Sequence, residues 1–204
     1  MALFDLFRRK PPIRDQAGVA VFIDENSAFL IQKGIYEYSR ARAGHYSKVL
    51  FAEPEFRDAV EASRWRAYPL GLAMVSEMVE GVLRPHVTDR HVALEELNDV
   101  VLGIFDRYPV PASLGQERWR VQRAELARRL QLIGLHPVKR VIDVPEQWAQ
   151  AYFDLMPIHE KLRGRDFLTT RNYLRVSLCN IYEAFTKRLD TAAVLSSFSR
   201  SKVA

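Results

Sequence analysis

Residues 69–82 read PLGLAMVSEMVEGV, and this stretch decides the fold class of the chain. Its apolar side chains recur every three or four residues, at Leu72, Val75, Val79 and Val82. This spacing is that of one face of an α-helix. A second set widens the apolar face: Leu70, Met74 and Met78. Because a helix that is apolar around most of its circumference is buried, these residues are predicted to form the central helix of an all-α domain.

The flanking sequence shows the same helical periodicity. Amphipathic patterns predict further helices at about 28–44, 55–66, 89–108, 116–133, 145–156 and 167–189. Pro69 is expected to start or kink the central helix, because proline lacks the backbone N–H of a helix interior. Two β-branched segments, Ala17–Asp24 and Val138–Val144, are predicted as short strands. The expected fold is an all-α compact bundle of six to eight helices, with at most a minor two-stranded β-ribbon.

One helical domain is expected to occupy residues 13–195. An amphipathic N-terminal segment at 1–12 precedes it, and a flexible tail at 196–204 follows it. The clearest loop, Pro109–Gly115, is expected to join two helices of the same core. Six residues on the helical stripes are predicted to be buried in that core: Leu97, Val101, Leu126, Leu130, Leu178 and Ile181.

The composition indicates a globular protein of a reducing compartment. Apolar residues make up 48% of the 204 residues and charged residues 27%, which is unlike a disordered chain. The single cysteine, Cys179, has no partner for an internal disulfide. No apolar run is long enough to span a bilayer, and the first basic cluster follows the first apolar one, the reverse of a secretory signal. We therefore expect a bacterial, cytoplasmic protein, with peripheral association at the inner face of the membrane as a further prediction.

Charge is unevenly distributed along the chain. Residues 1–50 carry eight Lys/Arg against five Asp/Glu, residues 51–110 carry six against eleven, and residues 111–204 carry sixteen against nine. Segments of opposite charge are expected to neutralise one another by packing together. Several acidic side chains of the middle segment are predicted to lie near Lys/Arg of residues 161–188, namely Glu77, Glu80, Glu95, Glu96 and Asp99.

Four arginines near the last long helix form a candidate anion-binding site: Arg163, Arg165, Arg171 and Arg175. A helix N-terminus with nearby guanidinium groups is suited to a phosphate or carboxylate. The competing interpretation is that these arginines pair with the acidic middle segment. If a ligand binds here, an apolar pocket is expected beside it, with Arg171 or Arg175 as the anion anchor. Its predicted lining is Met74, Met78, Trp148 or Phe153.

The sequence contains no recognisable catalytic, metal-binding or cofactor-binding pattern. None of the five histidines has a second histidine three or four residues away, so no metal site is predicted. There is no Gly-x-Ser-x-Gly elbow and no glycine-rich phosphate loop. The arginines of residues 118–129 scatter around their predicted helix, which argues against nucleic acid as a partner. We therefore expect no catalytic residues, no metal and no cofactor.

The N-terminal sequence MALFDLFRRK, residues 1–10, is the most suggestive segment. Its apolar and basic side chains form a candidate membrane- or partner-binding element: Leu3, Phe4, Leu6, Phe7, Arg8, Arg9 and Lys10. Over these ten residues it is similar to the short membrane-targeting start of the bacterial division regulator MinE, which implies binding to an anionic membrane. Each basic residue contributes about 1 kcal/mol near such a surface. The alternative is that the same side chains dock on the protein's own core or on a sister subunit.

These observations favour a non-enzymatic helical interaction or adaptor protein that associates peripherally with an anionic membrane surface. A protein partner or a sister subunit is expected. The first alternative is a small-molecule or lipid-binding helical protein, or an enzyme with an unfamiliar site, that uses an apolar pocket and an arginine anion anchor. Its small-molecule ligand is not specified by the sequence. Nucleic-acid binding is the third alternative.

Overall fold

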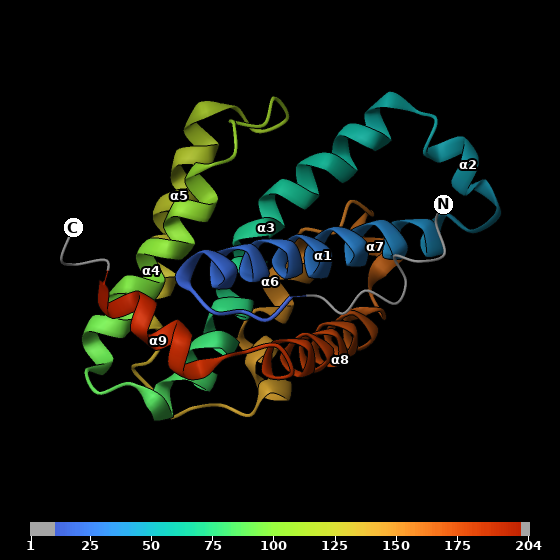
Figure 1. Ribbon diagram of the computed structural model, residues 1–204. Helices are drawn as coiled ribbons and strands as arrows, with labels where there is room; N and C mark the ends of the chain where they lie inside the picture. Colours follow the sequence, from blue (N-terminus) through green and yellow to red (C-terminus); the bar gives the residue numbers. More distant parts are fainter. Residues whose placement is uncertain (1–10, 201–204) are drawn as a thin grey trace, which may run out of the picture.

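The computed structural model describes residues 11–200 as a bundle of helices (Figure 1). The α-helices are α1 (Gln16–Ala43), α2 (Ser47–Leu50), α3 (Pro54–Leu83), α4 (Arg90–Asp106), α5 (Gly115–Leu132), α6 (Ala149–Asp154), α7 (Glu160–Arg163), α8 (Phe167–Thr186) and α9 (Thr191–Arg200). Short 3₁₀ helices are η2 (Gly44–Tyr46), η3 (Arg84–His86) and η4 (Val141–Gln147). This described part of the chain has no β-sheet, so the predicted all-α fold is confirmed.

Both segments predicted as strands have other structures. Residues 17–24 lie at the start of α1, where Asp15 Oδ1 accepts a hydrogen bond from Gly18 N at 2.7 Å and caps the helix. Their buried side chains, at positions 19, 22 and 23, have helical spacing. Residues 138–144 form an irregular segment that enters η4. The strand predictions were wrong because β-branched residues follow their tertiary surroundings more than an intrinsic backbone preference.

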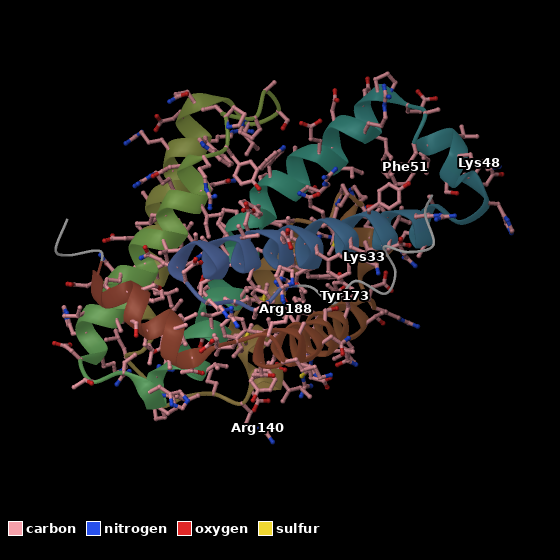
Figure 2. All side chains as sticks on the ribbon, viewed as in Figure 1. Lys33, Lys48, Phe51, Arg140, Tyr173 and Arg188 are labelled. Carbon is pink, nitrogen blue, oxygen red and sulfur yellow. The ribbon has the colours of Figure 1, made fainter. Side chains whose placement is uncertain are left out.

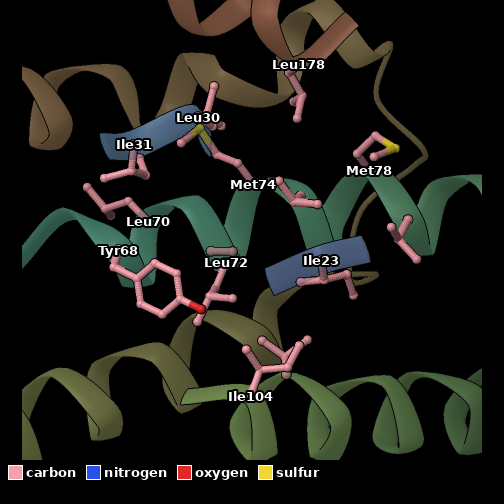
Figure 3. Close-up of a cluster of buried hydrophobic side chains, with 14 of the residues drawn as sticks. Ile23, Leu30, Ile31, Tyr68, Leu70, Leu72, Met74, Met78, Ile104 and Leu178 are labelled. Atoms are coloured by element: carbon pink, nitrogen blue, oxygen red, sulfur yellow. The ribbon is translucent and has the colours of Figure 1, made fainter. Parts of the chain in front are cut away.

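Helix α3 is the central helix, as predicted, but Pro69 does not interrupt it. Residues 67–80 are all buried, because α1, α4 and α8 pack around them. Figure 3 shows the side chains of this contact region, including Ile23, Leu30, Met74, Ile104 and Leu178. Burial on all sides offsets the one helical hydrogen bond that Pro69 cannot donate.

The predicted core positions are confirmed. Each of the six is at most 4% exposed: Leu97, Val101, Leu126, Leu130, Leu178 and Ile181. They belong to α4, α5 and α8, and they join one continuous hydrophobic cluster with the central helix. Apolar periodicity therefore identified the faces that these helices bury.

A backbone link joins the start of the described chain to its C-terminal part. Ile13 N donates to Arg188 O at 2.8 Å, and Asp190 N donates to Ile13 O at 2.9 Å. Arg188, labelled in Figure 2, also donates from Nε to Pro11 O at 3.0 Å. The Ile13 side chain is buried, so this residue is anchored both by its backbone and by its side chain.

Helix α9 packs against α1 near the same link. Gln16 N donates to Ser197 Oγ at 2.9 Å, and the side chains of Val194 and Phe198 are buried. Helix α9 ends at Arg200, so residues 196–200 of the predicted flexible tail are helical. The apolar side chains of α9 are covered by the bundle, which stabilises a segment whose serine-rich sequence suggested fraying.

Candidate functional site

Carboxylates of the acidic middle segment lie next to basic side chains other than those predicted. Glu80 Oε2 lies 2.6 Å from Arg84 Nη2 within the same helical region. Glu77 Oε1 lies 2.8 Å from Lys139 Nζ, and Glu95 Oε1 lies 3.4 Å from His91 Nδ1. None of these partners belongs to residues 161–188, so the prediction is wrong for these three carboxylates. The helices that actually touch decide the pairing, and local sequence does not reveal them.

The candidate anion-binding arginines are Arg163, Arg165, Arg171 and Arg175. Three of them contact two different parts of the chain, α6 and η4. Arg163 Nη1 donates to a backbone carbonyl of α6, and Arg165 is exposed. Arg171 and Arg175 face η4, where carboxylate oxygens of Glu146 lie 3.7 Å from Arg171 Nη1 and 3.3 Å from Arg175 Nε. An anion at this position would have to compete with Glu146.

A groove with a volume of about 650 Å³ lies between the C-terminal part of α3, the segment 136–144 and α8. Helix α3 contributes Met78 and α8 contributes Cys179 and Tyr182. We call it the α3–α8 groove. Of the residues predicted to line an apolar pocket, Met78 lines this groove, whereas Met74 is fully enclosed in the core.

A buried carboxylate fastens the segment 136–147 to α3 beside this groove. Glu77 accepts hydrogen bonds from Lys139 Nζ and Gln147 Nε2, each at 2.8 Å. His136 Nε2 lies 3.6 Å from Glu77 Oε1, and Arg84 Nη1 donates to His136 O at 2.8 Å. A buried charge is tolerated only when it is paired and hydrogen-bonded. The network therefore holds this otherwise irregular segment against the central helix.

Helix α1 exposes a stripe in which aromatic and basic side chains alternate. Phe29, Lys33, Tyr36 and Arg40 are separated by four, three and four residues. This spacing places them on one face of the helix, and all four are exposed. Lys33 Nζ lies 4.8 Å from the centroid of the Phe29 ring. Sequence reasoning followed the buried face of α1 and missed this exposed one, although the same spacing rule would have found it.

The stripe continues onto the turn that follows α1. Gly44 has a φ of 54°, a left-handed value that favours glycine, and the chain folds back through η2 and α2. The side chains of Tyr46 and Val49 are 73% and 60% exposed, and Lys48 is exposed between them. The neighbouring Arg42 is excluded from the stripe because its Nε lies 3.1 Å from Asp166 Oδ2.

Aromatic contacts hold this end of the molecule together. The ring centroid of Phe51 lies 5.0 Å from that of Tyr36 and 5.1 Å from that of Phe56. Figure 2 shows Lys48 and Phe51 near the C-terminal end of α1, the helix that also carries Lys33. Residues 38–52 contain no Asp or Glu. We refer to the exposed set as the aromatic–basic stripe: Phe29, Lys33, Tyr36, Arg40, Tyr46, Lys48 and Val49.

A carboxylate and two tyrosines connect three helical regions elsewhere in the bundle. The hydroxyls of Tyr68 and Tyr108 both donate to Asp24 Oδ1, at 2.6 and 2.7 Å. Burial raises the pKa of both tyrosines, and the hydrogen bonds to Asp24 raise these pKa values further. Both rings also contact Trp65. The cluster ties α1 and α3 to the end of α4, and this is a structural role.

The free energy of unfolding is expected to fall as the pH rises above about 10, the ordinary pKa of tyrosine. Because the folded state raises the pKa of Tyr68 and Tyr108, it holds their protons more tightly than the unfolded chain does. Their contribution is complete below about pH 10 and is lost as the pH climbs toward the folded pKa values. Urea unfolding at a series of alkaline pH values measures this decline. Tyr108→Phe should show a shallower decline, and an equally steep one would contradict the prediction.

Neither a membrane-spanning helix nor a candidate metal site is found among residues 11–200. No helix within residues 11–200 is both long and apolar enough to cross a membrane. No group of three His, Cys, Asp or Glu residues in the same range is placed to hold a metal ion. The candidate membrane- or partner-binding residues lie outside the described residues: Leu3, Phe4, Leu6, Phe7, Arg8, Arg9 and Lys10.

Comparison with known proteins adds no functional information. No family model, no curated protein and no solved structure matches this chain. The evidence for function therefore comes from the geometry of the aromatic–basic stripe and of the α3–α8 groove.

Proposed function

We propose that this protein is a non-enzymatic interaction protein that binds peripherally to an anionic membrane surface through the aromatic–basic stripe. One observation carries the proposal: exposed aromatic and aliphatic side chains alternate with cations along α1 from Phe29 onward and on the turn that follows it. Residues 38–52 contain no carboxylate side chain, whereas Glu37 is exposed next to Tyr36. Exposed apolar groups gathered among charges are typical of interaction surfaces.

Each part of the stripe has a physical role at a membrane–water boundary. Tyrosine rings favour the headgroup region, because the ring is apolar and the hydroxyl is polar. Phe29 and Val49 add apolar area that enters the same boundary. The three cations of the stripe are each attracted to anionic lipid by about 1 kcal/mol. Such a sum gives weak and reversible binding, and stable attachment needs a second element.

Residues 1–10 supply a second element of the same chemistry. They combine Phe4 and Phe7 with three consecutive cations at residues 8–10. Because this segment and the stripe are both cationic, they repel each other and are attracted to the same anionic surface. Two weak elements that engage one surface together bind more tightly than either does alone.

The charge pairs of α5 support a membrane as the anionic partner in preference to a nucleic acid. Three of its exposed arginines form ion pairs of 2.6–2.8 Å with neighbouring carboxylates: Arg120 with Glu117, Arg123 with Asp106, and Arg128 with Glu125. Binding to a phosphate backbone relies on cations that neutralise successive phosphates. Arginines that are already paired along α5 are poorly suited to that task.

Reversal of two stripe charges, Lys33→Glu with Lys48→Glu, is expected to weaken binding to anionic vesicles roughly a thousandfold. Two attractive charges are lost and two repulsive ones are added, which changes the binding free energy by about 4 kcal/mol. Co-sedimentation with vesicles of phosphatidylcholine and phosphatidylglycerol measures the effect. Vesicles of phosphatidylcholine alone should retain little protein, and added salt should weaken binding by the wild type.

The matched control reverses two exposed cations away from the stripe, Arg107→Glu with Arg118→Glu. It changes the net charge by the same amount, so it should weaken binding far less. Equal losses for both variants would contradict a role for the stripe. If the wild-type protein does not bind anionic vesicles and forms a dimer that the stripe variant disrupts, the partner is instead a sister subunit.

A further inference from the structure

We infer that the α3–α8 groove binds a small amphiphilic molecule with an apolar body and an anionic end, of the class of medium-chain carboxylates. This site is separate from the aromatic–basic stripe and does not depend on the membrane proposal. Its volume of about 650 Å³ lies within the range of about 300–1,000 Å³ that is common for small-molecule pockets.

The walls of the groove are mostly hydrocarbon. They come from the end of α3 and from the segment that crosses it, and they include Met78, Val82, Val138, Val141, Ile142 and Val144. Val138 and Ile142 remain 50% and 36% exposed although they are apolar. Covering such surface with an apolar chain removes it from water, which is favourable.

The charges around the groove favour an anionic end over a cationic one. Glu77 and Glu80, the carboxylates among the lining residues, are only 5% and 6% exposed, and each is bonded to its own cation. Apart from Tyr182, which is 37% exposed, the accessible polar side chains are basic: His86, His136, Lys139 and Arg140. A cationic ligand in the groove would therefore meet only carboxylates that are buried and already paired.

Lys139 is the main donor available to that anionic end. His136 directs Nδ1 toward Pro137 O at 3.1 Å, and its Nε2 lies 3.6 Å from Glu77 Oε1. Of the other bases, His86 and Arg140 are exposed, but the Nε of Arg140 lies 2.6 Å from Asp143 Oδ2. Lys139 directs one hydrogen bond to Glu77, and a lysine ammonium has three donors. The Glu77 network also holds Lys139 in place, so the site is organised before a ligand arrives.

Cys179 provides a direct reporter of occupancy. It is the only cysteine of the chain, it is partly exposed, and it lines the wall contributed by α8. A molecule lying in the groove covers the thiol and slows its reaction. An amphiphile that merely unfolded the protein would expose the thiol and accelerate the same reaction, so the two effects are distinguishable.

The test measures the rate at which neutral iodoacetamide alkylates Cys179 in the full-length protein. Three probes with the same chain are compared, namely decanoate, decanol and decylammonium. Decanoate is expected to slow alkylation at least tenfold at saturation, decanol to require at least tenfold higher concentration, and decylammonium to have no effect. Equal protection by all three would overturn the anionic specificity, and no protection by decanoate would overturn the site.

A paired substitution tests the assignment of the donor. Glu77→Gln with Lys139→Met removes the cation without leaving a buried carboxylate unpaired, and it should raise the decanoate concentration for half-protection at least tenfold. The matched control neutralises the exposed pair Glu117 and Arg120 of α5, as Glu117→Gln with Arg120→Met, and should leave that concentration unchanged. Equal shifts in both variants would contradict the role of Lys139.

Discussion

Removal of residues 1–10 is expected to abolish co-sedimentation with anionic liposomes and to leave the melting temperature nearly unchanged. The segment holds a triple basic cluster beside four bulky apolar side chains, which makes it one of the two elements proposed to bind lipid. The aromatic–basic stripe alone is a single weak signal, and single weak signals give only marginal membrane attachment. Phe4→Ala with Phe7→Ala should have nearly the same effect on binding.

The melting temperature should survive this deletion because the contacts that fasten the start of the described chain are kept. Pro11 O and both backbone groups of Ile13 are bonded to the end of α8 and the residues that follow it. The Ile13 side chain is 1% exposed. A truncation that stops at residue 10 retains all of these contacts. Melting curves of the full-length and truncated proteins, recorded by circular dichroism, provide the measurement.

Ile13→Ala in the full-length chain is the matched control. It keeps the N-terminal segment and removes a buried aliphatic side chain, which costs about 2–5 kcal/mol. Liposome binding should therefore persist while the melting temperature falls, the reverse of the deletion. If the deletion itself lowers the melting temperature strongly and the full-length protein ignores liposomes, residues 1–10 are core or dimer contacts and the membrane proposal is wrong.

Gly34→Ala is expected to lower the free energy of unfolding by about 2–4 kcal/mol. Gly34 lies where α1 meets two tyrosines, one from α6 and one from α8. A Cβ atom here would overlap the hydroxyl of Tyr152 and would lie 2.5 Å from Tyr173 Cε1. The Tyr152 hydroxyl donates to Ile31 O at 3.2 Å, and the Tyr173 hydroxyl donates to Leu30 O at 2.9 Å.

The cost has two sources. Overpacking of a dense contact typically costs about 1–3 kcal/mol, and each lost hydrogen bond costs about 1 kcal/mol. The higher helix propensity of alanine offsets about 1 kcal/mol of this loss of stability. Chemical denaturation of the purified variant measures the difference.

Gly103→Ala is the control for that substitution. Gly103 also lies inside a helix, but a Cβ atom there meets nothing within 4 Å. It should therefore raise stability by about 0.5–1 kcal/mol through helix propensity alone. A Gly34→Ala protein as stable as the Gly103→Ala protein would show that the two tyrosines do not pack against α1 as described.

The fold class was predictable from the sequence, because apolar spacing along a helix is a local property. The stripes around Leu97, Leu126 and Leu178 correctly identified buried faces. The boundaries were less predictable. Helix α1 begins at Gln16, well before the predicted start, and α3 runs through Pro69. In both places the packing of neighbouring helices outweighed a local preference for strand or for a helix break.

The candidate sites were far less predictable. The α3–α8 groove combines Met78, Lys139 and Cys179, which lie on three separate stretches of the sequence. No local pattern connects them, and the ion pair between Glu77 and Lys139 replaced the predicted pairing with residues 161–188. The exposed stripe on α1 was visible in the spacing of its residues, but its exposure follows only from how α1 packs on α3.

The sequence by itself determined that this protein is all-α and which residues its long helices bury, because burial imposes a repeat of three to four residues that can be read one segment at a time. Only the tertiary structure decided which charges pair, which apolar side chains stay in water and where a ligand-sized groove opens. These features depend on contacts between segments that are far apart in the chain, and the free energy of each contact exists only when both segments are in place.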